Sequence, residues 1–227
     1  MLEYPVLVKE RKIQQEMEYK NESILKYTIK YPQFVSLYFR EFLEKLNAYY
    51  STRALMYEKS NVMKMFQLAM VEYEYSVANN FPIRQFEAYK DYQVGYNQNC
   101  AISLYFDQYE YTGGAHGNTI RSSDSWNLRR SKKIELNDVF APRDNLREYL
   151  VGIINQQIKQ EASAEVNTYF EDYSSLVEKN FKMNSFFLTK EGVVLYFQQY
   201  EIAPYASGIP TFLIRYGEEG AVSPSCC

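Results

Sequence analysis

The segment Tyr109–Thr119 reads YEYTGGAHGNT and carries His116, the only histidine in the 227-residue chain. The segments on either side are rich in aromatic residues and alternate between apolar and polar side chains, which predicts strands. The segment itself is then a loop joining two strands of a run that extends from Ile83 to Phe140. Three glycines allow this loop backbone angles that other residues avoid: Gly113, Gly114 and Gly117.

The part of the chain before this run predicts two strands and a long helix. Val6 to Pro32 predicts two strands around a polar turn at Asn21–Ser23. The second strand, ILKYTIKYP, alternates strongly and ends at Pro32. From Val35 to about Ala78, apolar residues recur every three or four positions, which is typical of a helix. The polar stretch Glu58–Asn61 is expected to interrupt or kink this helix.

The part after the run predicts further helices followed by strands. An apolar stripe from Leu146 to Ile158 indicates a second helix, and the run Glu165–Phe181 a further helical segment. A hairpin with its turn at Lys190–Gly192 and a last strand beginning at Thr211 complete the pattern.

Together these elements predict the α+β class. We expect two packed subdomains built from mostly antiparallel sheets, with one long N-terminal helix and a second helix packed on the C-terminal sheet. The expected organisation is an N-terminal strand-helix-strand domain over residues 1–117, a C-terminal domain over residues 118–217 and a disordered tail over residues 218–227.

The charge balance argues against a nucleic-acid partner. The net charge is -3 and the pI is about 5.4, whereas nucleic-acid binders normally carry a basic excess. The densest basic cluster, LRRSKK at Leu128–Lys133, is short and typical of a solvated strand end. No run approaches the ~18 continuous apolar residues of a membrane span. The N-terminus has no signal-peptide pattern, so the chain as written is expected to be cytoplasmic.

The aromatic content is high, with 23 tyrosines and 14 phenylalanines. A strand-rich fold with half-buried tyrosines is the main explanation, and a carbohydrate-binding or protein-binding face accounts for the remainder.

The three cysteines are Cys100, Cys226 and Cys227. Adjacent cysteines rarely bond to each other because the small ring is strained. A bridge from Cys100 to the tail stays open as an alternative, but no pattern supports it and no disulfide framework is visible.

His116 is the first candidate for chemistry. A catalytic histidine needs a nucleophile or an orienting carboxylate nearby, and the sequence offers Cys100 on the preceding strand and Ser122, Ser123 and Asp124 on the following one. None of them lies in a recognisable nucleophile motif. The favoured interpretation is a histidine that shapes a tight turn, and a third alternative is a recognition tip that a partner approaches closely.

Cofactor motifs are missing from the sequence. There is no phosphate-binding glycine loop, Walker motif or dinucleotide fingerprint. One histidine with scattered cysteines does not make a zinc site. We therefore expect no cofactor, no metal and no catalytic residue.

Three stretches together resemble a known family: YTGGAHGNT (Tyr111–Thr119), KKIELNDVF (Lys132–Phe140) and FFLTKEGVVLYFQQYEIAPYASGIPTFLIRY (Phe186–Tyr216). They are similar to the paired domains of unknown function in the extracellular part of the lysozyme-sensing anti-sigma factor RsiV and in the region preceding the catalytic domain of the peptidoglycan deacetylase PdaC. The opening strands and the long helix resemble the first domain of that pair. The resemblance extends from about Pro5 to Tyr216.

The resemblance implies an α+β domain pair without a catalytic role of its own. It also implies lysozyme or peptidoglycan fragments as partners and a location outside the membrane, where most relatives lie. The chain departs from its relatives because the sequence shows no signal peptide, membrane span or sigma-binding segment.

A second loop, APYASGIP at Ala203–Pro210, suits recognition. Its prolines stiffen it, its small residues let a partner approach, and Tyr205 offers an aromatic anchor. The alternative is a plain turn whose tyrosine packs inward. We expect the two loops to form one recognition edge, with these candidate binding residues: Gly113, Gly114, Ala115, His116, Gly117, Pro204, Tyr205, Ser207 and Gly208.

The leading hypothesis is a non-catalytic binding module of bacterial cell-envelope type that recognises lysozyme or peptidoglycan. One alternative is a cytoplasmic protein-interaction domain with an unknown partner. The other is a hydrolase that uses His116.

Overall fold

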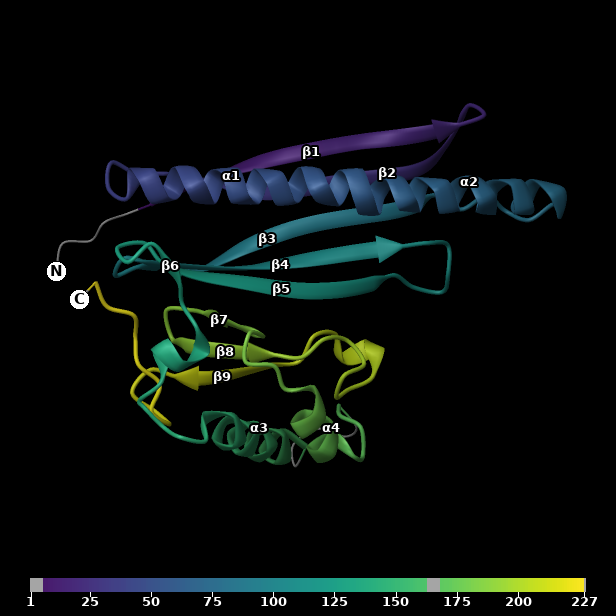
Figure 1. The fold of residues 1–227 in the computed structure, drawn as a ribbon. Helices are drawn as coiled ribbons and strands as arrows, with labels where there is room; N and C mark the ends of the chain where they lie inside the picture. The colour runs from purple at the N-terminus through teal and green to yellow at the C-terminus, as the bar shows by residue number, and fades with distance from the viewer. Residues whose placement is uncertain (1–5, 163–167, 227) are drawn as a thin grey trace. The chain divides into compact units, whose positions relative to one another are not determined.

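The structure is a computed structural model that describes residues 6–162 and 168–226 (Figure 1). It divides into two compact units. Among the described residues, the N-terminal unit comprises residues 6–92 together with Phe106–Ile120, and the C-terminal unit comprises Gln93–Tyr105 and the chain from Arg121 onward. The described residues form two sheets, one with strand order β1-β2-β3-β4-β5-β6 and one with order β7-β8-β9.

The N-terminal unit begins with a long antiparallel hairpin of β1 (Leu7–Tyr19) and β2 (Glu22–Val35). Lys20 and Asn21 join the strands with left-handed backbone angles, φ 51° and 67°, as a tight two-residue hairpin requires. The prediction that Pro32 ends the second strand is wrong, because Pro32 pairs with Glu10 inside the hairpin. The other neighbour, β3, pairs with β2 only as far as Ile29, so a residue without an N–H group is tolerated at position 32.

The long helix is confirmed, and its interruption takes a defined form. Helix α1 (Arg40–Tyr57) passes into a π-helical turn at Glu58–Val62 and then into α2 (Met63–Ala78). The extra residue of a π turn lets one helix keep its apolar residues directed at the same sheet on both sides of the turn. Buried side chains of both helices and of the turn pack against β2, among them Ala54, Val62 and Ala69.

One strand pairing departs from the expected antiparallel pattern. Strand β3 (Phe86–Gln98) pairs in parallel with β2, with Leu25 opposite Phe86. The long helix carries the chain back to the starting end of β2, and such a crossover is what makes a parallel pair. Strands β4 (Ala101–Tyr111), β5 (Asn118–Asn127) and the short β6 (Lys132–Lys133) follow.

The C-terminal unit contains the antiparallel sheet of β7 (Phe186–Leu188), β8 (Gly192–Tyr196) and β9 (Thr211–Arg215). Helix α3 (Leu146–Ala162) lies along this sheet, as Figure 1 shows, and buries Leu150, Ile154 and Ile158 in the core of the unit. The short α4 (Tyr173–Asn180) covers part of the further helix that the sequence predicts; the start of that run, Glu165, lies outside the described residues. The predicted α+β class with a second helix on the C-terminal sheet is confirmed.

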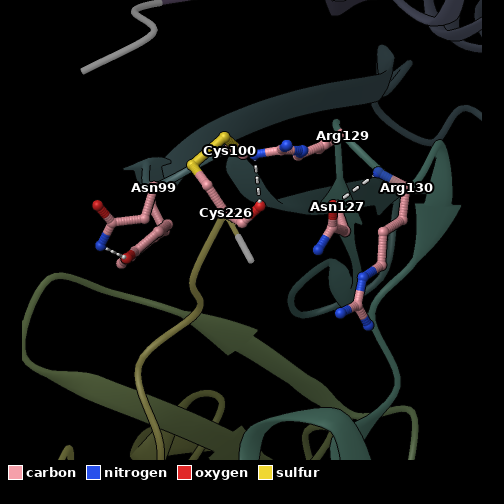
Figure 2. The surroundings of a disulfide bond; sticks show 7 residues. Asn99, Cys100, Asn127, Arg129, Arg130 and Cys226 are labelled. Atoms are coloured by element: carbon pink, nitrogen blue, oxygen red, sulfur yellow. Dashed lines mark hydrogen bonds between the residues drawn. A yellow bond between two sulfur atoms is a disulfide. The ribbon is translucent and has the colours of Figure 1, made fainter. Parts of the chain in front are cut away.

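The C-terminal segment is ordered as far as Cys226, in contrast to the expected disorder. Ala221 forms a bridge with Phe140, and the Val222 N–H donates to the Val139 carbonyl at 2.9 Å. A disulfide joins Cys226 to Cys100, with 5.1 Å between the Cα atoms and a sequence separation of 126 residues (Figure 2). The segment is polar and has few apolar residues. Its order therefore depends on these tertiary contacts and could not be expected from its composition.

None of the helices in the described part of the chain combines the length and the apolar character that crossing a membrane requires.

Candidate functional site

The glycine-rich loop connects β4 to β5 within the N-terminal unit. Gly113 has φ 86°, a left-handed value that favours glycine, and its carbonyl accepts a hydrogen bond from Arg84. Gly117 is needed for a different reason, because a Cβ atom there would stand 2.3 Å from Cε2 of the Tyr109 ring. Gly114 meets neither condition, since its nearest neighbour would be 3.9 Å away and its φ is not left-handed.

His116 is exposed at the tip of this loop, and its Nδ1 lies 3.1 Å from the carbonyl oxygen of Gly117. Gly114 and Ala115 are also exposed. The tip thus presents small residues beside one imidazole ring, held by the strands on both sides. This geometry agrees with the histidine shaping the turn and leaves the loop tip accessible to a partner.

Three of the four side chains that the sequence offers as catalytic partners for His116 have other contacts, Ser122 being the fourth. Cys100 is oxidised in the disulfide. The hydroxyl of Ser123 donates to the carbonyl of Phe186, and the buried carboxylate of Asp124 pairs with Lys133 at 2.8 Å. These three groups therefore contribute to the packing of the C-terminal unit.

The second loop, between β8 and β9, is tied down at its beginning by Gln198. The side-chain amide of Gln198 accepts from the N–H of Arg121 and donates to the carbonyl of Arg121, both at 2.8 Å. The Gln198 N–H in turn donates to Glu201 Oε2 at 2.7 Å. Glu201 also accepts from Asn180 through its carbonyl and pairs with Lys182 through its carboxylate, both at 2.7 Å. Such a network leaves this stretch of the loop little freedom.

The middle of the loop is fixed as well. Pro204 precedes a short 3₁₀ turn at Tyr205–Ser207, and Gly208 leaves it with φ 66°. The hydroxyl of Ser207 donates to the carbonyl of Thr168 at 2.8 Å. The neighbouring Tyr169 donates to Glu161 at 2.7 Å, and burial followed by this hydrogen bond raises its pKa well above the ordinary tyrosine range. The loop is therefore attached through Ser207 to the backbone at Thr168, next to a tyrosine that is itself hydrogen-bonded to Glu161.

Two tyrosine rings stand together on this loop. Tyr200 and Tyr205 have ring centroids 5.8 Å apart and planes inclined by 33°. Tyr200 is 52% exposed and Tyr205 is half-buried, so the pair offers a partly open aromatic surface. Tyr200 also has φ 65°, an uncommon conformation for a bulky residue. Two hydrogen bonds between Gln198 and Glu201 close the turn that contains Tyr200.

Sequence reasoning found Tyr205 and missed Tyr200. The available signal was weak: YEIAPY places two tyrosines five positions apart in a loop, and nothing local reveals that the chain brings their rings together. The two candidate loops belong to different units. That they form one recognition edge therefore stays a prediction.

Among the residues that the structure describes, no group of three or more His, Cys, Asp or Glu side chains is arranged to hold a metal ion.

Two family profiles match the chain one after the other. The profile described as Deacetylase PdaC matches residues 17–119, and the profile described as Protein of unknown function (DUF3298) matches residues 137–217. The predicted resemblance to tandem domains of this kind is thereby confirmed.

A characterised relative supports the first match. The chain is 21% identical over 126 residues to the peptidoglycan-N-acetylmuramic acid deacetylase PdaC of Bacillus subtilis (strain 168). The match covers 55% of this chain and 27% of the deacetylase, so the chain corresponds to a minor part of that protein.

Two crystal structures share the fold. A DUF3298 family member from Bacteroides fragilis superposes with a TM-score of 0.71 at 17% identity, covering 94% of this chain and 92% of that chain. A DUF3298 family protein from Pseudomonas aeruginosa superposes with a TM-score of 0.56 at 17% identity, covering 97% and 95%.

Proposed function

Because this chain carries a PdaC-type domain and a DUF3298 domain in tandem, we propose that it is a non-catalytic binding module of the bacterial cell envelope. Its partner is a lysozyme or a peptidoglycan fragment. The relation to a peptidoglycan deacetylase supports the envelope context. The observation that carries the proposal is the pair of tyrosines, Tyr200 and Tyr205, on a loop tied down by hydrogen bonds.

A binding surface of this kind benefits from rigidity. Tyrosine offers a large contact area with few rotatable bonds, and a loop that is already ordered loses little entropy when it binds. The network around Glu201 and the hydrogen bond of Ser207 order this loop within its own unit. The ring faces suit stacking on the apolar face of a sugar or insertion into an aromatic-lined cleft, and both lysozyme and a glycan fragment offer such a contact.

The direct test is calorimetric titration of the purified chain with a c-type lysozyme and, in parallel, with muropeptides. We expect saturable one-to-one binding of one of the two. Tyr205→Ala removes one ring. Tyr200→Asn removes the other while keeping a residue that tolerates a left-handed backbone. Each substitution should weaken binding by about tenfold or more, as for the aromatic anchor of an interface.

The matched control is Tyr75→Ala. Tyr75 is 55% exposed, close to the exposure of Tyr200, but lies on α2 in the other unit. This substitution should leave the affinity unchanged. Absence of heat with both ligands, or equal losses in the control and the loop variants, would contradict the proposal.

The hydrolase alternative is tested with the same material. If the module is non-catalytic, muropeptides incubated with the chain stay intact, and His116→Ala changes nothing in their chromatographic profile. Turnover that His116→Ala abolishes without lowering the melting temperature would favour the enzyme. The cytoplasmic alternative is tested by fractionation of the native host, where recovery from the wall or the medium would remove it.

A further inference from the structure

A pocket of about 200 Å³ lies in the C-terminal unit between the turn that joins β5 to β6 and the C-terminal segment. Arg130 and Lys132 lie on the side of the turn, and residues 222–225 form the opposite wall. None of its lining residues belongs to the two candidate loops, so the pocket is independent of the recognition site proposed above.

The charges around the pocket are mostly positive. Arg130 and Lys132 contribute two cations against one carboxylate, Asp138, which lies 3.4 Å from Lys132 Nζ. Ser223 and Ser225 line the opposite wall and carry hydroxyls that can donate hydrogen bonds, and the Ser223 hydroxyl also lies 3.4 Å from that of Tyr96. A guanidinium fork, an ammonium group and hydroxyl donors around one small space are the groups that bind an oxyanion.

The turn that carries the cations has a defined conformation. The N–H of Arg130 donates to the side-chain oxygen of Asn127 at 2.9 Å. Figure 2 shows the two neighbouring arginines leaving the turn in different directions, Arg129 toward Cys226 and Arg130 away from it. Arg129 Nη1 donates to the carbonyl of Cys226 at 3.0 Å. Arg129 therefore holds the end of the opposite wall at Cys226, and Arg130 lines the pocket.

The opposite wall is secured at its two ends. At one end, the N–H of Val222 donates to the carbonyl of Val139. At the other end, Cys226 is bonded to Cys100, which lies in the tight turn between β3 and β4. Residues 223–225 between these ends form neither helix nor strand. The disulfide is therefore the covalent support of this wall.

We propose that this pocket binds a small oxyanion, a carboxylate or phosphate group, and that the Cys100–Cys226 disulfide holds the wall at residues 222–225 in place for it. Reduction by a dithiol releases the ligand. One thiolate of the reductant attacks a sulfur of the disulfide and forms a mixed disulfide, and the second thiolate displaces the remaining cysteine. The products are two cysteine thiols and the oxidised reductant, with two electrons and two protons transferred.

The experiment titrates the oxidised chain with inorganic phosphate and with an N-acetylated dipeptide that ends in a free carboxylate. The same dipeptide with an amidated end is the neutral control. We expect at least one of the two anions to bind and the amide not to bind. Arg130→Gln and the double substitution Ser223→Ala/Ser225→Ala, which both leave the disulfide intact, should each weaken binding by about tenfold or more. Lys190→Gln, on an exposed turn of the same unit, should have no effect.

The redox arm repeats the titration after reduction with dithiothreitol and with the variant Cys100→Ser/Cys226→Ser. Circular dichroism and a melting curve show whether the fold is retained. We expect the affinity to fall by about tenfold or more in both cases, since this end of the wall loses its covalent anchor and keeps only the hydrogen bond from Arg129 to Cys226. The proposal is overturned if neither anion binds the oxidised chain, if Arg130→Gln binds as tightly as the parent, or if a folded reduced chain binds with unchanged affinity.

Discussion

The ring of Tyr109 lies so close to Gly117 that a Cβ atom on the glycine would stand 2.3 Å from the ring. The backbone at Gly117 is buried, and the Tyr109 ring lies 6.3 Å from that of Tyr89 between centroids. A side chain at position 117 therefore has to displace an aromatic ring from its packing.

Gly117→Ala should lower the free energy of unfolding by about 1–3 kcal/mol, the usual cost of overpacking. Gly114→Ala, three residues earlier in the same loop, should cost less than about 0.5 kcal/mol because the nearest atom to its Cβ would be 3.9 Å away, an ordinary van der Waals distance. Urea denaturation of the two variants makes the comparison. In a Tyr109→Ser background, Gly117→Ala should lose most of its cost, and an unchanged cost would contradict this explanation.

Ser103 is a buried polar residue with two partners. Its hydroxyl oxygen accepts from the N–H of Leu188 at 2.8 Å and lies 2.7 Å from the hydroxyl of Ser125. Ser103→Ala leaves the N–H of Leu188 without this acceptor and should cost about 1–3 kcal/mol in unfolding free energy. Ser175→Ala, on the exposed face of α4, is the control and should change stability by less than about 0.5 kcal/mol. Equal effects would show that the buried hydrogen bond is not the cause.

Alkaline pH should destabilise the N-terminal unit through Tyr27. Its hydroxyl donates to Glu58 at 2.6 Å, and burial followed by this hydrogen bond raises its pKa from 10.0 to about 12. Between about pH 10 and pH 12 the unfolded chain has lost this proton while the folded chain keeps it. The contribution of Tyr27 is thus complete below pH 10 and is lost as the pH rises through this window.

Urea denaturation of the parent and of Tyr27→Phe from pH 9 to pH 12 measures this contribution. The variant should show a shallower fall of unfolding free energy with pH. Tyr75→Phe, on the exposed face of α2, should keep the slope of the parent. A parallel fall in the parent and in Tyr27→Phe would exclude Tyr27 as the source.

The disulfide predicts both a thiol count and a stability difference. Of the three cysteines, only Cys227 should react with a thiol reagent when the chain is denatured without reductant. Cys100→Ser/Cys226→Ser should lower the free energy of unfolding by about 2–4 kcal/mol, since the bond closes a long loop in the unfolded chain. Three reactive thiols in the unreduced protein would contradict the pairing.

Much of the local structure could be predicted from the sequence. The alternation before Pro32, the three-to-four spacing beyond Val35 and the polar interruption at Glu58–Asn61 all correspond to observed elements, because hydrophobic period and turn chemistry act over a few residues. The π turn itself could not be predicted. Its extra residue depends on where the sheet lies beneath the helix.

The candidate site was predictable only in part. Gly113 and Gly117 are conspicuous in the sequence, but the reason for each, a left-handed φ in one case and a neighbouring ring in the other, requires coordinates. Tyr200 could not be predicted because its role depends on the approach of its ring to Tyr205 and on the hydrogen bonds between Gln198 and Glu201 that close its turn.

The sequence by itself determined the α+β class, the long helix and the two glycine- and tyrosine-bearing loops, since these follow from periodicity and from residue types within short windows. Only the tertiary structure decided the parallel pairing of β3 with β2, the order of the C-terminal segment and the bond between Cys100 and Cys226. These features join residues far apart in the chain. A local sequence pattern does not indicate which distant strand or cysteine will be the partner, because that pairing depends on how the whole chain packs.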